Sequence, residues 1–451
     1  MIGIGRRAQA TVASTGSWQG RPAGLPGAVP PPSVPLSFLA AAALGLVACG
    51  VAWAWASGAA ATDPTGDHVV AAAHLGLLAA LSMGVLGAVH QFVPVISQRP
   101  LRSVRLARAT FVAWLGGSWL LPLGIGAAYE PVVEAGGALA ALAIGLLVAN
   151  MSHALAARGK GAPVTGLRFA LAGFVATACY GLVYVADRRG KWFDLAGHVV
   201  LAHAVVGLFA WLGLTYVAVA EKLWPMFFLA HVPDRHRWGR VAVWAVPAGV
   251  ALLSPGLLAG VAPLAAAGAV VLASGLASHL ASLSVYVRHR RRKPDLHLLF
   301  VLTSAAWLPV GAVLALVASV VMASHHHAGT ALVAAAVAAG AGWLLEALVG
   351  HLFKVVPFIG WAALRGRGVD KAPGGKPLLF ADLYDHTWAA VSYGLLTCGL
   401  VALCTGLAAS LPAATAAGGG LLALTAPVVG VNLALRPARL LRAPVAVAPV
   451  P

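Results

Sequence analysis

The chain has 451 residues, of which 60% are hydrophobic and only 10% are charged, and its formal net charge is +17. Its apolar residues come in blocks of about twenty or more, the length of helix that crosses a bilayer core. This composition excludes a water-soluble fold, because backbone exposed to lipid must be helical or form a closed barrel. We therefore predict one all-α bundle, with the lipid bilayer as partner and no separate soluble domain.

Taken in chain order, residues 1–33 are rich in Pro, Gly and Ser and lack an apolar period, which predicts a disordered basic tail. Twelve apolar blocks then fill residues 34–435, and residues 436–451 form a second short tail. The predicted spans are 34–56, 67–93, 104–128, 135–157, 166–186, 195–220, 241–260, 264–287, 296–322, 328–355, 387–409 and 414–435.

The basic residues sort by loop. All but three of the 30 lysines and arginines fall in the tails and in alternate loops, and the exceptions are Arg188, Arg189 and Lys191. Cytoplasmic loops carry an excess of Lys and Arg, so this distribution predicts a multi-pass protein of the plasma membrane with both tails cytoplasmic. The net charge then indicates contact with anionic lipid, and it requires no nucleic-acid partner.

An internal repeat marks the ends of three even-numbered spans. The matching segments are His90-Gln-Phe-Val-Pro94, Glu221-Lys-Leu-Trp-Pro225 and Phe353-Lys-Val-Val-Pro357, with prolines 131 and 132 residues apart. A proline removes a backbone donor, so we expect each one to end its helix at the membrane surface. Four helices separate successive copies, which predicts three four-helix arcs around a pseudo-threefold axis.

Five short motifs accompany the repeat: His74-Leu-Gly-Leu-Leu, Gln91-Phe-Val-Pro94, Ala202-His203, Lys222-Leu-Trp-Pro-Met-Phe and Lys354-Val-Val-Pro-Phe. With histidines on the second and sixth spans of three four-helix arcs, the chain resembles subunit I of the haem-copper oxidases over about residues 34–435. The motifs resemble, more narrowly, those of shortened oxidase-like and NnrS-type bacterial proteins.

The resemblance implies a b-type haem, an accompanying copper ion, oxidoreductase chemistry and an electron donor such as a cytochrome or quinol. It places haem or metal ligands at His74 on the second span and His203 on the sixth, with His351 on the tenth as a further cofactor residue. The chain departs from the family in three ways. The seventh span, 241–260, has no histidine, and no His-Pro-Glu-Val-Tyr sequence follows on the sixth. The tenth span has no histidine in its outer half apart from the run at its mouth.

Chemistry gives the histidines a second interpretation. Neutral imidazole is a common ligand of haem iron and copper, but a lone intramembrane histidine can equally hydrogen-bond a neighbouring helix. His74 and His203 lie at similar depth in successive repeats, which favours ligation. His68 and His198 sit at the water boundary, where solvation is the simpler interpretation although metal binding is possible.

Other histidines lie nearer the surface. The run His325-His326-His327 can bind copper or zinc, or form a solvated loop. Four more lie in or beside basic loops and are predicted to be on the surface: His231, His236, His289 and His297.

The cytoplasmic ends of the spans carry a further group. His90 and His351 stand four and six residues before their repeat prolines, and Glu346 lies just over one helical turn from His351. Glu346 and His90 can form a proton path, since intramembrane ionisable residues often do. Alternatively, Glu346 pairs with a nearby cation.

Two classes of function remain. One is a haem-binding or haem-copper protein of redox or nitric-oxide handling type, and the other is a cofactor-free transporter or channel on the same scaffold. The threefold repeat weakens the second, because common secondary transporters are built from two related halves. The absence of histidines from the seventh span and from the outer half of the tenth favours the transporter or channel.

The topology can be tested by cysteine-accessibility labelling of single cysteines introduced at Asp63 and Arg290. We expect residue 290 to react from the cytoplasmic side and residue 63 from the opposite side, because basic loops stay in the cytoplasm. Labelling of both positions from one side would contradict the predicted topology.

Overall fold

A computed structural model describes most of the chain. The described ranges are 30–156, 161–192, 197–232, 237–323, 329–372 and 375–442. Within them the protein is helical, and the sole strand pairing is an isolated bridge between Lys371 and Pro377. Twelve of these helical stretches are long and apolar enough to cross a membrane, so the protein is an all-α, multi-pass membrane bundle.

The spans fall into three successive groups of four. The first group is α1 (Ser33–Trp55), the composite α3 (Asp67–His74), η1 (Leu75–Ser82) and α4 (Met83–Ser97), α5 (Val104–Gly126) and α6 (Glu130–Leu155). The second is α7 (Gly161–Gly190), the composite α8 (Gly197–Val205), η2 (Val206–Gly213) and α9 (Leu214–Phe228), α10 (Trp238–Leu258) and α11 (Ala262–Arg288). The third is α12 (Leu296–Ala323), the composite α13 (Gly329–Val337), η3 (Ala338–Leu345) and α14 (Glu346–Arg365), α15 (His386–Ala408) and α16 (Pro412–Arg442).

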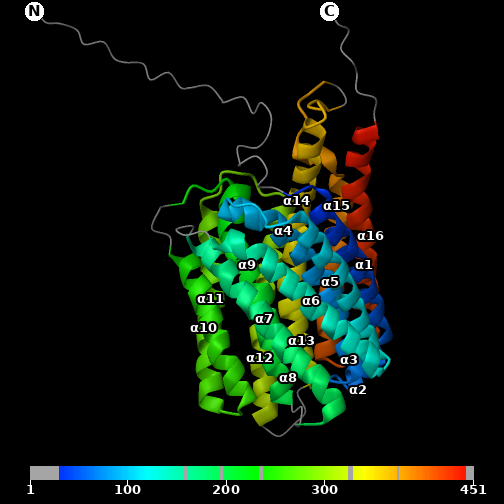
Figure 1. The fold of residues 1–451 in the computed structure, drawn as a ribbon, viewed down its shortest axis with the longest axis vertical. Coiled ribbons are helices and arrows are strands. Elements are labelled where there is room, and N and C mark those ends of the chain that lie inside the picture. The colour runs from blue at the N-terminus through cyan, green and yellow to red at the C-terminus, as the bar shows by residue number, and fades with distance from the viewer. Residues whose placement is uncertain are drawn as a thin grey trace, which may run out of the picture.

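Two short helices lie in connections, α2 (Ser57–Thr62) and η4 (Phe380–Leu383). Because the number of spans is even, α1 begins and α16 ends at the same end of the bundle, uppermost in Figure 1. We call this the basic end, because the connections that hold most of the lysines and arginines lie there, and we call the opposite one the far end. Residues 1–29 and 443–451 of the predicted tails lie outside the described ranges, and the helix expected to stop at 435 continues to Arg442.

Cations at the far end are compensated by carboxylates. Arg188 lies 3.1 Å from Asp67 and 3.0 Å from Glu130, and Arg189 lies 2.8 Å from Glu134. Two of the three basic residues that depart from the loop pattern are therefore ion-paired, which lowers their net charge at the membrane surface.

The three composite spans share an internal feature that the sequence did not reveal. Each contains an eight-residue π-helical segment in its middle: η1, η2 and η3. The first residues of these segments are 75, 206 and 338, so they repeat with the same 131 and 132 spacing as the prolines. A π-helix inserts extra residues into a turn and rotates the next part of the helix about its axis. The repeat therefore extends to backbone geometry deep inside the bundle.

The prediction that the repeat prolines end their helices was wrong. Pro94, Pro225 and Pro357 all lie inside helices. A proline forfeits one backbone hydrogen bond, and the residues after it can still close the last turn. In the first two repeats the helix ends three residues later, where Gln98 and Leu229 both adopt left-handed backbone conformations, with φ of 56° and 50°.

The tenth span also runs ten residues beyond its predicted end at 355, to Arg365. A segment between α14 and α15 that the other repeats lack covers this extension, burying Leu364, Leu378 and Leu383 together. The segment is fixed to α16 where Asp385 and Asn432 exchange backbone and amide hydrogen bonds of 2.7 and 2.9 Å. The backbone N–H groups of Trp388 and Thr387 hold the pKa of the Asp385 carboxyl below its usual value.

In each repeat the third and fourth helices form a tight hairpin. A Cβ atom added to one glycine of the fourth helix would collide with the backbone nitrogen of a leucine on the third. The equivalent pairs are Gly136 with Leu121, Gly268 with Leu253 and Gly418 with Leu403. The turns match as well, each with one residue of positive φ: Ala128 (49°), Gly260 (67°) and Ser410 (53°). Small residues permit such close helix approach in lipid, so the three hairpins are packed alike.

This packing predicts the effect of two alanine substitutions on α6. Gly136→Ala should lower the free energy of unfolding by about 1–3 kcal/mol, the usual range for an overpacked contact. Gly145→Ala is the matched control, because a Cβ there has no neighbour within 4 Å. Thermal unfolding in detergent should separate the two variants, and equal melting temperatures would contradict the close hairpin.

Candidate functional site

Two histidines from different repeats lie beside each other in the far half of the bundle. His74 is the last residue of α3, seven residues after Asp67, and His203 lies near the end of α8, three residues before η2. Their ring centroids are 6.5 Å apart and the ring planes differ by 11°. The structure thus brings together the two residues that the sequence singled out.

His74 and His203 nevertheless occupy different positions in their repeats. Counted by the π-helical segments, His74 corresponds to Val205, two residues from His203. The two histidines are therefore equivalent only to within two residues of the repeat. They come into contact because the second and sixth spans pack close together at this depth. A Cβ at Gly340 of η3 would lie 3.3 Å from carbon atoms of both Leu77 and Leu208, so the three π-helical segments converge close to the histidines.

Hydrogen bonds orient the ring of His74. Its Nδ1 lies 2.8 Å from the carbonyl oxygen of Val70, the geometry in which Nδ1 carries the proton and Nε2 keeps its lone pair. Metal-ligating histidines commonly donate their second ring nitrogen to a backbone carbonyl, as Nδ1 of His74 does here. The buried Nδ1 of His203, by contrast, has no partner within the described residues.

Two tyrosines of α7 border His203, at centroid distances of 6.5 Å for Tyr180 and 5.6 Å for Tyr184. The hydroxyl of Tyr184 donates to the carbonyl of Val199 at 2.6 Å, and the hydroxyl of Tyr180 lies 2.8 Å from that of Ser254 on the seventh span. We call His74, His203, Tyr180 and Tyr184 the outer histidine site.

The ring separation defines what the pair can bind. An imidazole nitrogen binds a metal at about 2 Å, so two rings on opposite sides of one ion have centroids on the order of 6 Å apart. The observed 6.5 Å between His74 and His203 fits such a trans arrangement. Imidazole is a ligand of haem iron, so these two residues could hold a haem.

The remaining histidines predicted at the far end do not join this site. His68 and His198 are exposed, and the ring of His68 packs against Trp55 at 4.6 Å. The run His325-His326-His327 lies outside the described residues. Within the described chain, no group of three or more His, Cys, Asp or Glu side chains is arranged to hold a metal ion.

His351, expected to share the cofactor, instead lies at the basic half of the bundle beside His297, with ring centroids 4.8 Å apart. The prediction that His297 is on the surface was wrong, since its side chain is only 2% exposed. His297 lies in the first turn of α12, where Phe227 and Phe228 of α9 cover it. Sequence reasoning also passed over His279, which is buried on α11 and whose signal was one imidazole in an apolar span.

Glu346 is fully buried at the start of α14. Its carboxylate accepts hydrogen bonds from Thr303 at 2.9 Å, Trp307 at 2.9 Å and Thr397 at 2.8 Å. These donors are neutral, and no ion pair to Glu346 occurs within the described residues, so two hydroxyls and an indole stand where the second interpretation placed a cation.

His90, the other member of the predicted proton path, is also fully buried, but in a different place. Its ring stacks on Phe38 at 5.0 Å and its Nδ1 lies 2.7 Å from the carbonyl of Leu86. No described hydrogen bond or ring contact connects His90 with Glu346. Glu346 has three donors, whereas the buried Nε2 of His90 has no partner among the described residues, and no described contact links the two residues into the predicted path.

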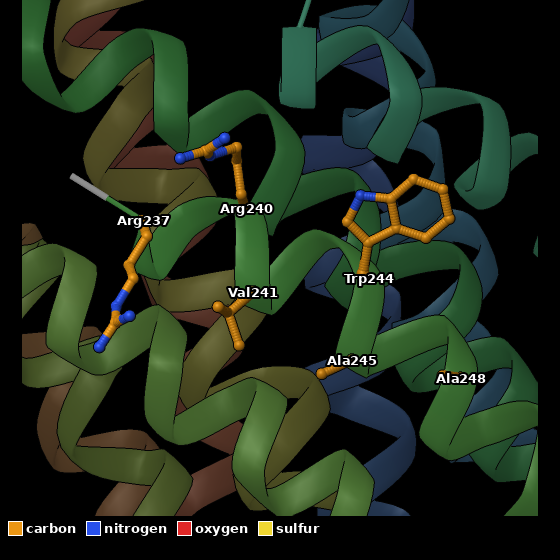
Figure 2. A pocket seen from close by; sticks show the side chains of 6 residues that line it. All are labelled: Arg237, Arg240, Val241, Trp244, Ala245 and Ala248. Carbon is orange, nitrogen blue, oxygen red and sulfur yellow. The ribbon is translucent and has the colours of Figure 1, made fainter. Parts of the chain in front are cut away.

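A separate hollow of about 590 Å³ lies on α10 at the basic end. Figure 2 shows Arg237 and Arg240 on one side of it and Trp244 and Ala248 on the other, with Val241 and Ala245 between them. Basic side chains above an apolar floor suit contact with phospholipid. No histidine lines this hollow, so it is distinct from the outer histidine site.

No protein-family model matches the chain, and no curated protein sequence is significantly similar to it.

The Glu346 contacts predict the effect of removing one donor. Trp307→Phe should lower the free energy of unfolding by about 1–3 kcal/mol, because a buried carboxylate oxygen loses its partner. Trp244→Phe is the matched control, since Trp244 is 59% exposed at the hollow on α10. Equal unfolding temperatures for the two variants would show that the indole of Trp307 contributes nothing to Glu346.

Proposed function

We propose that the outer histidine site binds a b-type haem and that the protein handles electrons or nitric oxide in the plasma membrane. The observation that carries this proposal is the facing pair His74 and His203, two imidazoles from different repeats at a separation suited to one metal ion. The resemblance of their surrounding motifs to haem-copper oxidase subunit I supports the same conclusion.

The residues of the site have distinct roles in this proposal. Val70 fixes His74 with its Nε2 lone pair available, and the orphaned nitrogen of His203 would gain a partner. Ligation would offset the cost of leaving a polar atom buried and unpaired. Tyr184 packs edge-on against His203 and restricts its ring. A haem held in this way supplies reversible one-electron chemistry or, with one axial position open, a binding site for a small gas.

The membrane orientation fits this assignment. With the basic end in the cytoplasm, His74 lies about 10 Å below the far surface at 1.5 Å per residue, within reach of an electron donor such as a cytochrome or quinol. A copper ion beside the haem has less support. The seventh span offers Ser254 where a histidine would be needed, and the run at 325–327 lies outside the described residues.

The alternative function, a cofactor-free transporter or channel, has one observation in its favour. Glu346 is a buried carboxylate without a cationic partner among the described residues, as in many ion-coupled transporters. Fold alone does not separate the two classes, because function depends on the site. The presence or absence of haem does separate them.

We expect protein purified from haem-replete cells to show a b-type reduced-minus-oxidised spectrum. His74→Ala and His203→Ala should each weaken haem binding by about tenfold or more, since losing even a residue that supports a metal ligand costs that much. If one axial position remains open in the wild type, carbon monoxide or nitric oxide should shift the Soret band.

The matched control is His289→Ala, because His289 is exposed and has the same local hydrogen bond to the carbonyl four residues earlier. Its spectrum should equal that of the wild type. Haem-free wild-type protein, or unchanged spectra in both ligand variants, would refute the haem proposal and favour the transporter.

A further inference from the structure

Unpaired polar atoms concentrate at one place in the basic half of the bundle. Nine buried side-chain nitrogens have no hydrogen-bond partner within the described residues, and four of them belong to rings that contact Tyr216: those of Trp224, His279, Trp343 and His351. Two more are the ring nitrogens of His297, which contacts His351. Buried polar groups normally have hydrogen-bond partners, so such a concentration of unpaired nitrogens indicates that a water molecule or an ion binds there.

His297 and His351 form the tightest part of this region, and we call them the inner histidine pair. Their ring planes cross at 82° with centroids 4.8 Å apart, and no hydrogen bond joins them. The Nδ1 of His351 lies 2.7 Å from the carbonyl of Ala347, so its unpaired Nε2 carries the lone pair. Neutral His297 also has one lone pair without a partner, whichever nitrogen holds its proton.

The geometry differs from that of the outer histidine site in a way that matters for ligation. At about 2 Å per metal–nitrogen bond, a 6.5 Å separation places two rings opposite each other on an ion. The shorter 4.8 Å separation places them at neighbouring positions, as in a tetrahedral site. The inner pair is therefore suited to two adjacent ligand positions, with the others open to water or a small ligand.

The surroundings favour a metal that prefers nitrogen. The ring of Phe227 lies 5.1 Å from that of His297 and 5.9 Å from that of His351. Calcium and magnesium require several oxygen ligands, whereas zinc and copper accept imidazole. At the basic end, the carboxylate of Asp295, two residues before His297, pairs with Lys354 and Arg292.

We propose that His297 and His351 together bind one first-row transition-metal ion of the zinc or copper type, at a site separate from the outer histidine site. The proposal does not depend on haem binding, because the two sites share no residue and lie in opposite halves of the bundle.

The test is titration of cobalt(II) into chelator-treated, full-length protein in lipid nanodiscs, followed by its visible ligand-field bands. All samples carry His74→Ala, so that the outer pair cannot bind cobalt. We expect about one cobalt per chain with the intense bands of a tetrahedral site, and displacement by zinc. His297→Leu and His351→Leu should each weaken binding by about tenfold or more.

His289→Ala in the same background is the matched control and should bind cobalt as the parent does, since His289 is exposed at the same end of the bundle. His297→Gln and His351→Gln repeat the test with polar side chains, in case the leucine variants unfold. Absence of stoichiometric cobalt binding by the folded parent, or unchanged affinity in the folded glutamine variants, would overturn the proposal. Haem content, measured on protein with His74 intact, reports separately on the outer site.

Discussion

Every backbone N–H and C=O group in hydrocarbon must find its partner within the protein, and the rest of this structure depends on that constraint. It makes the whole described membrane region helical and leaves helix packing to small residues. The glycines of α6, α11 and α16 let each helix approach its neighbour backbone to backbone. The repeat prolines each cost one hydrogen bond, and Pro94 and Pro225 lie three residues before a helix end, where few such bonds are left to lose.

The π-helical segments are the clearest departure from regular helix, and they link the fold to the site. Each composite span contains one at the same position, and His74 and His203 stand just before theirs. Such segments occur often at functional sites. Leu77 of η1 and Leu208 of η2 both lie close to Gly340 of η3, so the three segments lie near one another. His74 and His203 are neighbours although they occupy different positions in their repeats.

Some polar groups inside the bundle have hydrogen-bond or ion-pair partners, and others have none among the described residues. Glu346 is fully paired with neutral donors, and the ion pairs at the far end neutralise Arg188 and Arg189. By contrast, the outer histidine site and the region around Tyr216 hold ring nitrogens without partners among the described residues. Since an unpaired buried polar group costs stability, the unpaired imidazoles, and not the paired carboxylate, are the places where a bound group would contribute most.

The sequence by itself determined the membrane class, the twelve spans and the repeat, because hydropathy, loop charge and the spacing of Pro94, Pro225 and Pro357 are local or periodic signals. It also singled out His74 and His203 by depth. Only the tertiary structure decided the burial of His297 and His279 and the neutral partners of Glu346. These depend on which side chains of other helices cover a residue: Phe227 and Phe228 over His297, and Thr303, Trp307 and Thr397 around Glu346. Such contacts join residues tens of positions apart, and hydropathy along one span carries no information about them.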